Sequence, residues 1–76
     1  MKDLIQTIVE YLCDEPDLVE VHEIEGDSCS ILEVTVGKND LGKVIGKNGK
    51  TAQSIRNIIY ACSHKFNKRY TIELTT

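Results

Sequence analysis

The chain has 76 residues, of which 41% are hydrophobic and 28% are charged, and its formal net charge is −3. This length allows one small domain, which buries only about 60% of the surface of its unfolded chain. No apolar run approaches the roughly 18 residues of a membrane span, and the chain begins with an amphipathic pattern rather than a signal-peptide core. We therefore expect a single domain over residues 1–76, located in the cytoplasm and not in a membrane.

The charges are divided unevenly along the chain. Residues 1–36 carry one lysine and ten acidic residues, whereas residues 37–76 carry eight Lys/Arg and two acidic residues, so the halves hold −9 and +6, which sum to −3. A uniformly acidic protein would repel nucleic acid, but a bipolar one can present a basic surface to it. The simpler alternative is that these basic residues are solvated helix positions. The residues concerned are Lys43, Lys47, Lys50 and Arg56.

Cysteine and histidine give no sign of catalysis or metal binding. Cys13, Cys29 and Cys62 are odd in number and form no CxxC, so we expect small apolar side chains in a reducing compartment rather than disulfides or a zinc site. His22 and His64 have no nucleophile or carboxylate pair at a meaningful spacing. We expect no enzymatic activity, no cofactor and no metal ion.

The first half of the chain predicts a helix followed by a β-hairpin. Residues 2–13 place apolar side chains on one stripe, which predicts an amphipathic helix ending before Glu15-Pro16. Residues 19–24 predict a strand whose imperfect alternation suggests a bulge, and residues 25–28 predict a turn. The cleaner alternation of residues 30–36 predicts a strand with one buried face.

The second half predicts two helices and a last strand. A short helix is expected over residues 41–45, with Asn39 or Asp40 as its cap. After a glycine turn, apolar residues at helical spacing predict a long helix to about His64, and alternation over residues 70–74 predicts a strand. The order is α-β-β-α-α-β, which by pattern alone is an α+β two-layer sandwich.

The turn between the two helices reads Gly46-Lys47-Asn48-Gly49, a GxxG sequence. Glycines permit positive φ, and flanking lysines supply charge beside the free N–H groups at the start of the long helix, which fits a phosphodiester backbone. A P-loop is excluded, because Val44 occupies the position of its first glycine and a helix precedes the turn; the glycine spacing also excludes the dinucleotide fingerprint. A helix corner with surface lysines remains the plain alternative.

The longer segment GKVIGKNGKTAQSIR resembles the signature of KH domains, which bind RNA or single-stranded DNA and hold about four nucleotides at the GxxG loop. The match is close over residues 41–59. The order of elements extends it to nearly the whole chain, which resembles small bacterial single-domain KH proteins of the KhpA family. The resemblance implies a type II KH fold, with a three-stranded mixed sheet packed against three helices on one face.

The resemblance also implies a function and partners. It indicates a protein that binds single-stranded RNA, as an RNA chaperone or post-transcriptional regulator, and that forms a homodimer or pairs with a larger KH-containing, KhpB-like protein. We expect Tyr60 to be a candidate for the dimer contact. Two alternatives remain open: a protein-interaction subunit in which the GxxG loop is residual, and a single-stranded DNA binder.

The expected RNA site combines the loop with an apolar floor. Backbone N–H groups and lysines would hold the sugar-phosphate chain. The bases would rest on Leu41 and neighbouring aliphatic residues, and would meet polar groups at the edge of the strand over residues 30–36. The predicted site residues are Lys43, Val44, Ile45, Gly46, Lys47, Asn48, Gly49, Lys50, Thr51 and Ile55.

Overall fold

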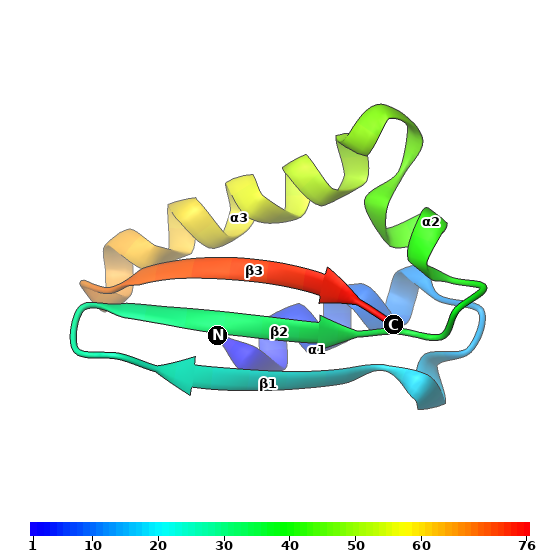
Figure 1. The fold of residues 1–76 in the computed structure, drawn as a ribbon. Coiled ribbons are helices and arrows are strands. Elements are labelled where there is room, and N and C mark those ends of the chain that lie inside the picture. Colours follow the sequence, from blue (N-terminus) through cyan, green and yellow to red (C-terminus); the bar gives the residue numbers. More distant parts are fainter.

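The fold has two layers, a three-stranded sheet and a set of helices that cover one of its faces (Figure 1). The structure is a computed structural model that describes all of residues 1–76. The predicted α-β-β-α-α-β order and the mixed sheet are confirmed. The elements are α1 (Lys2–Leu12), β1 (Glu20–Glu25), β2 (Cys29–Thr35), α2 (Leu41–Ile45), α3 (Lys50–Phe66) and β3 (Arg69–Thr75).

Strand β2 is the centre of the sheet. It pairs antiparallel with β1 and parallel with β3, and a parallel pair needs a crossover, which α2 and α3 supply. The register of β1 runs unbroken from Glu20 opposite Thr35 to Glu25 opposite Ser30, so the expected bulge is wrong. The alternation is imperfect because Ile24 lies on the uncovered face, where it is 51% exposed.

The core lies between the helices and the covered face of the sheet. Alternate residues of β2 and its extension point into it, as predicted for residues 30–36. On α1 the stripe is narrower than expected, because Leu4 and Leu12 remain partly exposed. Ser30 is fully buried and its hydroxyl has no hydrogen-bond partner. The core residues are Ile5, Val9, Val19, Val21, Leu32, Val34, Val36, Val44, Ile55, Ile59 and Ile72.

The ends of the elements differ slightly from the prediction. Helix α3 continues to Phe66 and ends at Asn67, whose left-handed backbone (φ 51°) lets the chain turn back into β3. A short 3₁₀ turn at Pro16–Leu18, which was not predicted, follows α1. The three cysteines are free thiols. No helix is both long enough and apolar enough to cross a bilayer.

Candidate nucleic-acid interface

The first glycine of the GxxG loop is fixed by packing. Gly46 has φ 78° and ψ 171°, a conformation that is essentially restricted to glycine. A Cβ at this position would lie 2.8 Å from the backbone nitrogen of Thr51 and closer still to the Thr51 side chain. The N–H of Gly46 donates to the carbonyl of Gly42 at 2.9 Å and closes α2. The loop therefore packs directly against the first turn of α3.

The tip of the loop is open by contrast. Asn48 (φ 57°, ψ 26°) and Gly49 (φ 74°, ψ 14°) are both left-handed, and asparagine is one of the few side chains that accepts this conformation. A Cβ at Gly49 would meet nothing within 4 Å. The N–H groups of Gly49 and Lys50 donate to the carbonyls of Gly46 and Lys47, and no side chain caps α3. The positive end of the helix dipole therefore faces the open tip. The tip can receive an anion.

The three lysines near the loop are not equivalent. Lys47 and Lys50 are exposed and have no carboxylate within ion-pair distance. Lys43 forms an ion pair with Asp14 and lies 3.9 Å from Asp40. The hydrogen bond to Asp14 is the main cause of a raised pKa for Lys43. Two of the three expected phosphate-binding lysines are therefore free, and the third is engaged within the protein.

A buried carboxylate fixes the start of α2. Asp40 is fully buried, and its two carboxylate oxygens accept the backbone N–H groups of Asp14 and Glu15 at 3.0 Å each. The hydrogen bond from Asp14 is the largest cause of a lowered pKa for Asp40, and the one from Glu15 is the second. Asp40 occupies the N-cap position of α2 as predicted, but its side chain bonds the segment after α1 instead of capping the helix. The helix that leads into the loop is thus joined to a distant part of the chain.

The predicted apolar floor is mostly covered. Val44 and Ile55 are 0% and 3% exposed and belong to the core, so they have no surface to offer a base. Ile45 is 38% exposed and Leu41 is half-buried. The expected role of the strand over residues 30–36 is wrong, because β2 has a partner on both sides. The crossover through α2 and α3 places β3 at the free edge instead.

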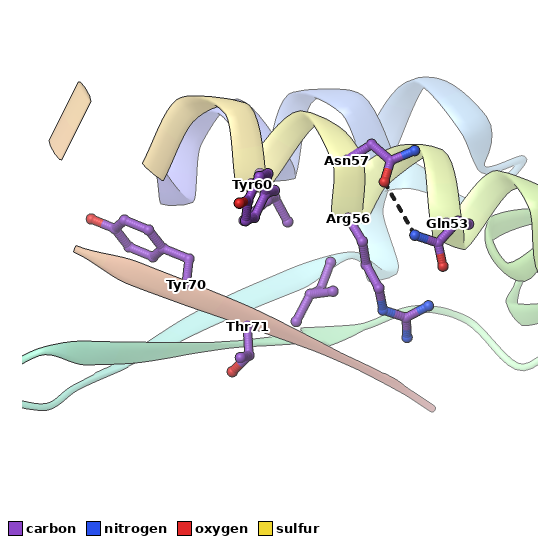
Figure 2. Close-up of a pocket in the computed structure, with 8 residues that line it drawn as sticks. Gln53, Arg56, Asn57, Tyr60, Tyr70 and Thr71 are labelled. Carbon is purple, nitrogen blue, oxygen red and sulfur yellow. Dashed lines mark hydrogen bonds between the residues drawn. The ribbon is translucent and has the colours of Figure 1, made fainter. Parts of the chain in front are cut away.

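A groove lies between α3 and this free edge. It has a volume of about 320 Å³ and begins about one helical turn beyond the GxxG loop. In Figure 2, Arg56 and Gln53 lie at one end of the groove, and Tyr60 and Tyr70 lie at the other. Gln53 donates a hydrogen bond to Asn57 at 3.1 Å, drawn as a dashed line. The lining residues are Gln53, Arg56, Asn57, Ile59, Tyr60, Tyr70, Thr71 and Ile72.

The edge of β3 also presents free backbone groups. In a parallel ladder, alternate residues direct their N–H and C=O groups to opposite sides. The N–H of Arg69 donates inward, to the carbonyl of Ser28 at 3.2 Å. The backbone groups of Tyr70, Ile72 and Leu74 therefore point away from β2, toward the groove side. They can pair with the polar edge of a ligand.

Sequence reasoning found only part of this groove. It singled out Arg56 for its charge and Tyr60 as a dimer contact, but it missed the other polar lining residues. One signal was available, because long polar and aromatic side chains recur at i, i+3, i+4 and i+7 along α3. Only the structure shows which strand faces this stripe. The missed residues are Gln53, Asn57, Tyr70 and Thr71.

The acidic strand β1 lies away from the groove. Strand β1, which carries Glu20, Glu23 and Glu25, forms the edge of the sheet opposite to β3. Lys47, Lys50 and the groove lie on the side of α3 and β3. The net charge of −3 thus does not apply to every surface, because no acidic residue lines the groove and Lys47 and Lys50 are unpaired.

Comparisons with known proteins agree with this geometry. The sequence profile described as "KhpA/KhpB, KH domain" matches residues 2–74. A protein of Clostridium acetobutylicum named "RNA-binding protein KhpA" is 47% identical over 74 residues, which cover 97% of this chain and 99% of the relative. Proteins of the same name from Caldanaerobacter subterraneus (46%; 97% of this chain, 99% of the relative) and Borreliella burgdorferi (42%; 95% and 88%) are also similar.

The match extends well beyond the loop. It spans every helix and strand of the fold, from α1 into β3, so the similarity concerns the whole domain and not the GxxG segment alone. The relatives are named as RNA-binding proteins, which agrees with the expectation of a non-enzymatic protein. The chain belongs to the KhpA/KhpB family of KH domains.

Proposed function

We propose that the protein binds single-stranded RNA along a path that starts at the GxxG loop and continues in the groove between α3 and β3. The observation that carries this proposal is that the loop and the groove follow one another along α3. The groove opens along α3 about one helical turn beyond the loop, on the side where the edge of β3 is free. A site for phosphates therefore lies next to a site for bases.

The loop suits the sugar-phosphate backbone. Its open tip lets a phosphate approach the positive end of the α3 dipole, and Gly49 adds no Cβ there. Lys47 and Lys50 add two cationic side chains that no carboxylate of the protein neutralises. These contacts depend on charge and shape and not on base identity. Binding at the loop is therefore tolerant of sequence and sensitive to salt.

The groove suits unpaired bases. Ile59 and Ile72 form its apolar base, and Gln53, Arg56 and Asn57 supply polar groups along α3. The outward backbone groups of β3 can hydrogen-bond the edges of bases, as a neighbouring strand would. In a duplex those edges are already paired, so duplex RNA should compete poorly.

The family also supports a proposal for the biological role. Relatives carry the name RNA-binding protein, and we propose that this protein acts on cellular RNA in the cytoplasm as a chaperone or post-transcriptional regulator. A single-stranded DNA binder and a protein-interaction subunit with a residual loop are the alternatives. The intact glycines and the unpaired lysines at 47 and 50 favour nucleic-acid binding over a residual loop.

A charge-reversal variant of the loop tests the proposal. Lys47→Asp combined with Asn48→Asp places two negative charges where phosphates would lie, and aspartate, like asparagine, tolerates the left-handed backbone at residue 48. We expect the affinity for single-stranded RNA to fall at least about tenfold, measured by filter binding at fixed salt. Circular dichroism should show an unchanged fold, since neither residue is in the core.

The chain offers a matched control for this variant. Lys38 and Asn39 are also an adjacent, exposed Lys-Asn pair, located in the turn before α2. Lys38→Asp with Asn39→Asp makes the same change in net charge, and we expect little loss of affinity. Equal losses of RNA affinity in the two variants would show a general effect of net charge, and would contradict the assignment of the GxxG loop as the phosphate-binding site. Tighter binding of single-stranded DNA than of RNA would favour the alternative ligand.

We also propose that the protein works as a pair of KH domains. A single loop that holds about four nucleotides makes few contacts, and a second linked loop raises the effective concentration at the RNA. The partner would be a second copy or a larger KH-containing, KhpB-like protein, in line with a family profile that covers both KhpA and KhpB. Sedimentation at micromolar concentration, with and without RNA, checks the homodimer. A pull-down that recovers a second KH protein checks the heterodimer.

A further inference from the structure

The groove does not end at the two tyrosines. A second hollow of about 630 Å³, here called the distal pocket, lies at the end of α3 that is farthest from the GxxG loop. It shares Tyr60, Tyr70 and Thr71 with the groove, so the two are continuous. Figure 2 shows Tyr60 projecting from α3 and Tyr70 from β3 at this junction. The distal pocket is lined by Tyr60, Ser63, His64, Asn67, Lys68, Arg69, Tyr70 and Thr71.

Aromatic rings stand at the entrance to the distal pocket. Tyr60 contacts the ring of His64 edge to face, with centroids 5.0 Å apart and an interplanar angle of 86°. Tyr60 remains 69% exposed, and an edge-to-face contact covers at most one face of a ring. Tyr70 is oriented by a similar contact with Phe66, at 6.3 Å. A ring face is therefore available beside the path of the proposed RNA strand.

The charge of the distal pocket is also positive. Arg69 is exposed and has no carboxylate within ion-pair distance. Lys68 lies 3.9 Å from Glu25, which is itself largely exposed, so this pair is loose. No acidic residue lines the pocket. A polyanion leaving the groove would meet cations and aromatic rings rather than carboxylates.

We propose that the distal pocket binds at least one further nucleotide of the same single strand, whose base stacks on the exposed ring of Tyr60 while Arg69 lies near its phosphate. This inference rests on the proposed function. It lengthens the site beyond the about four nucleotides that the GxxG loop holds. The added base is recognised by its π-face, which all four bases share. The distal pocket therefore requires a base but does not select one base over another.

The same features favour nucleic acid over a protein partner. A lone exposed tyrosine on α3 is equally suited to a dimer contact. Here the tyrosine stands at the end of a groove that begins at an anion-binding loop, and the pocket behind it is basic and open. Continuity and charge therefore indicate the RNA strand as the occupant.

Abasic RNA separates stacking from charge. Three six-nucleotide single strands of the same sequence are compared: an unmodified one, one with two abasic positions at its 5′ end, and one with two at its 3′ end. All carry the same number of phosphates. We expect the wild-type protein to bind the unmodified strand about fivefold more tightly than one of the two abasic strands, as for the loss of a stacked base.

Variants then assign that difference to the distal pocket. We expect Tyr60→Leu to bind the unmodified strand and that weaker abasic strand nearly alike, because the stacking ring is gone. His64→Leu removes the ring contact that orients Tyr60, and should clearly reduce the fivefold difference. His64 lines only the distal pocket, so its variant stays decisive if Tyr60→Leu also disturbs the groove. Tyr11→Leu is the matched control, because Tyr11 is 90% exposed on α1 and borders neither cavity. It should retain the fivefold difference.

The outcomes distinguish this inference from the proposed function. No binding of any strand, by wild type or variants, would overturn the proposed function itself. Binding of all three strands with equal affinity by the wild type would overturn only the distal pocket. A Tyr60→Leu protein that keeps the fivefold difference but changes from dimer to monomer on sedimentation would also overturn it, and would assign Tyr60 to a protein contact.

Discussion

The two ends of α3 are built in different ways. At the GxxG end the backbone is held tightly, since Gly46 packs against Thr51 and Asp40 joins α2 to the segment after α1. At the other end, Tyr60 contacts His64 on the same helix and Phe66 contacts Tyr70 of β3, in both cases edge to face. Phosphates are uniform along a nucleic acid and can be met by a fixed backbone conformation. Bases vary, and broad ring faces accommodate them.

The largest effect should come from the packed glycine at the GxxG end. Gly46→Ala adds a Cβ against Thr51 in a conformation that only glycine adopts easily, so we expect a loss of about 3 kcal/mol in the free energy of unfolding. Gly49→Ala has positive φ but open space, and should lose only about 1 kcal/mol. Urea unfolding monitored by circular dichroism measures both.

These two glycines should also differ in their effect on binding. Because a Cβ at Gly49 points into open space, Gly49→Ala should weaken RNA binding at a small cost in stability. If Gly49→Ala is the more destabilising of the two, or if it leaves the affinity unchanged, the division into a packed and an open glycine is wrong.

The same contrast explains what the sequence could predict. The α-β-β-α-α-β order and the GxxG loop depend on periodicity and on adjacent glycines, which are local features, and both were predicted correctly. The groove depends on which strand lies beside α3. Periodicity could not show that β2 is central or that β3 is a free edge. It did place Ile55 on the apolar face of α3, which is buried, so its expected role as an exposed floor for bases conflicts with that pattern. The hydrogen bonds that Asp40 accepts from Asp14 and Glu15, 26 and 25 positions away, could not be predicted from the sequence either.

Asp40 provides a second way to test the GxxG end. Asp40→Asn keeps the shape of the side chain but replaces one acceptor oxygen with an amide, which cannot accept the N–H of Asp14 or Glu15. We expect a clear loss of stability at neutral pH, seen as a lower Tm. Asp17→Asn, a change of an exposed aspartate near the same segment, is the control and should leave the Tm almost unchanged.

The pH dependence of stability follows from the direction of the pKa shift. The pKa of Asp40 is lower in the folded protein than in the unfolded chain, because the charged form accepts two backbone hydrogen bonds. Its contribution is therefore fully present above the unfolded value of about 3.9 and is lost as the pH falls through the lower, folded value. Below about pH 4, the Tm of wild type should fall more steeply than that of Asp40→Asn. Parallel curves would mean that Asp40 does not stabilise the fold through its charge.

The smallest effect we predict separates the lysines of the loop by their surroundings. Lys47 is free, so Lys47→Gln should remove about one phosphate contact and reduce the slope of log affinity against log salt by about 0.7. Lys43 is engaged by Asp14 and Asp40, so Lys43→Gln should leave that slope nearly unchanged and act mainly on stability. Titrations of single-stranded RNA at several salt concentrations measure both slopes. Equal reductions would show that Lys43 leaves Asp14 to bind the phosphate, and that the GxxG end rearranges when RNA binds.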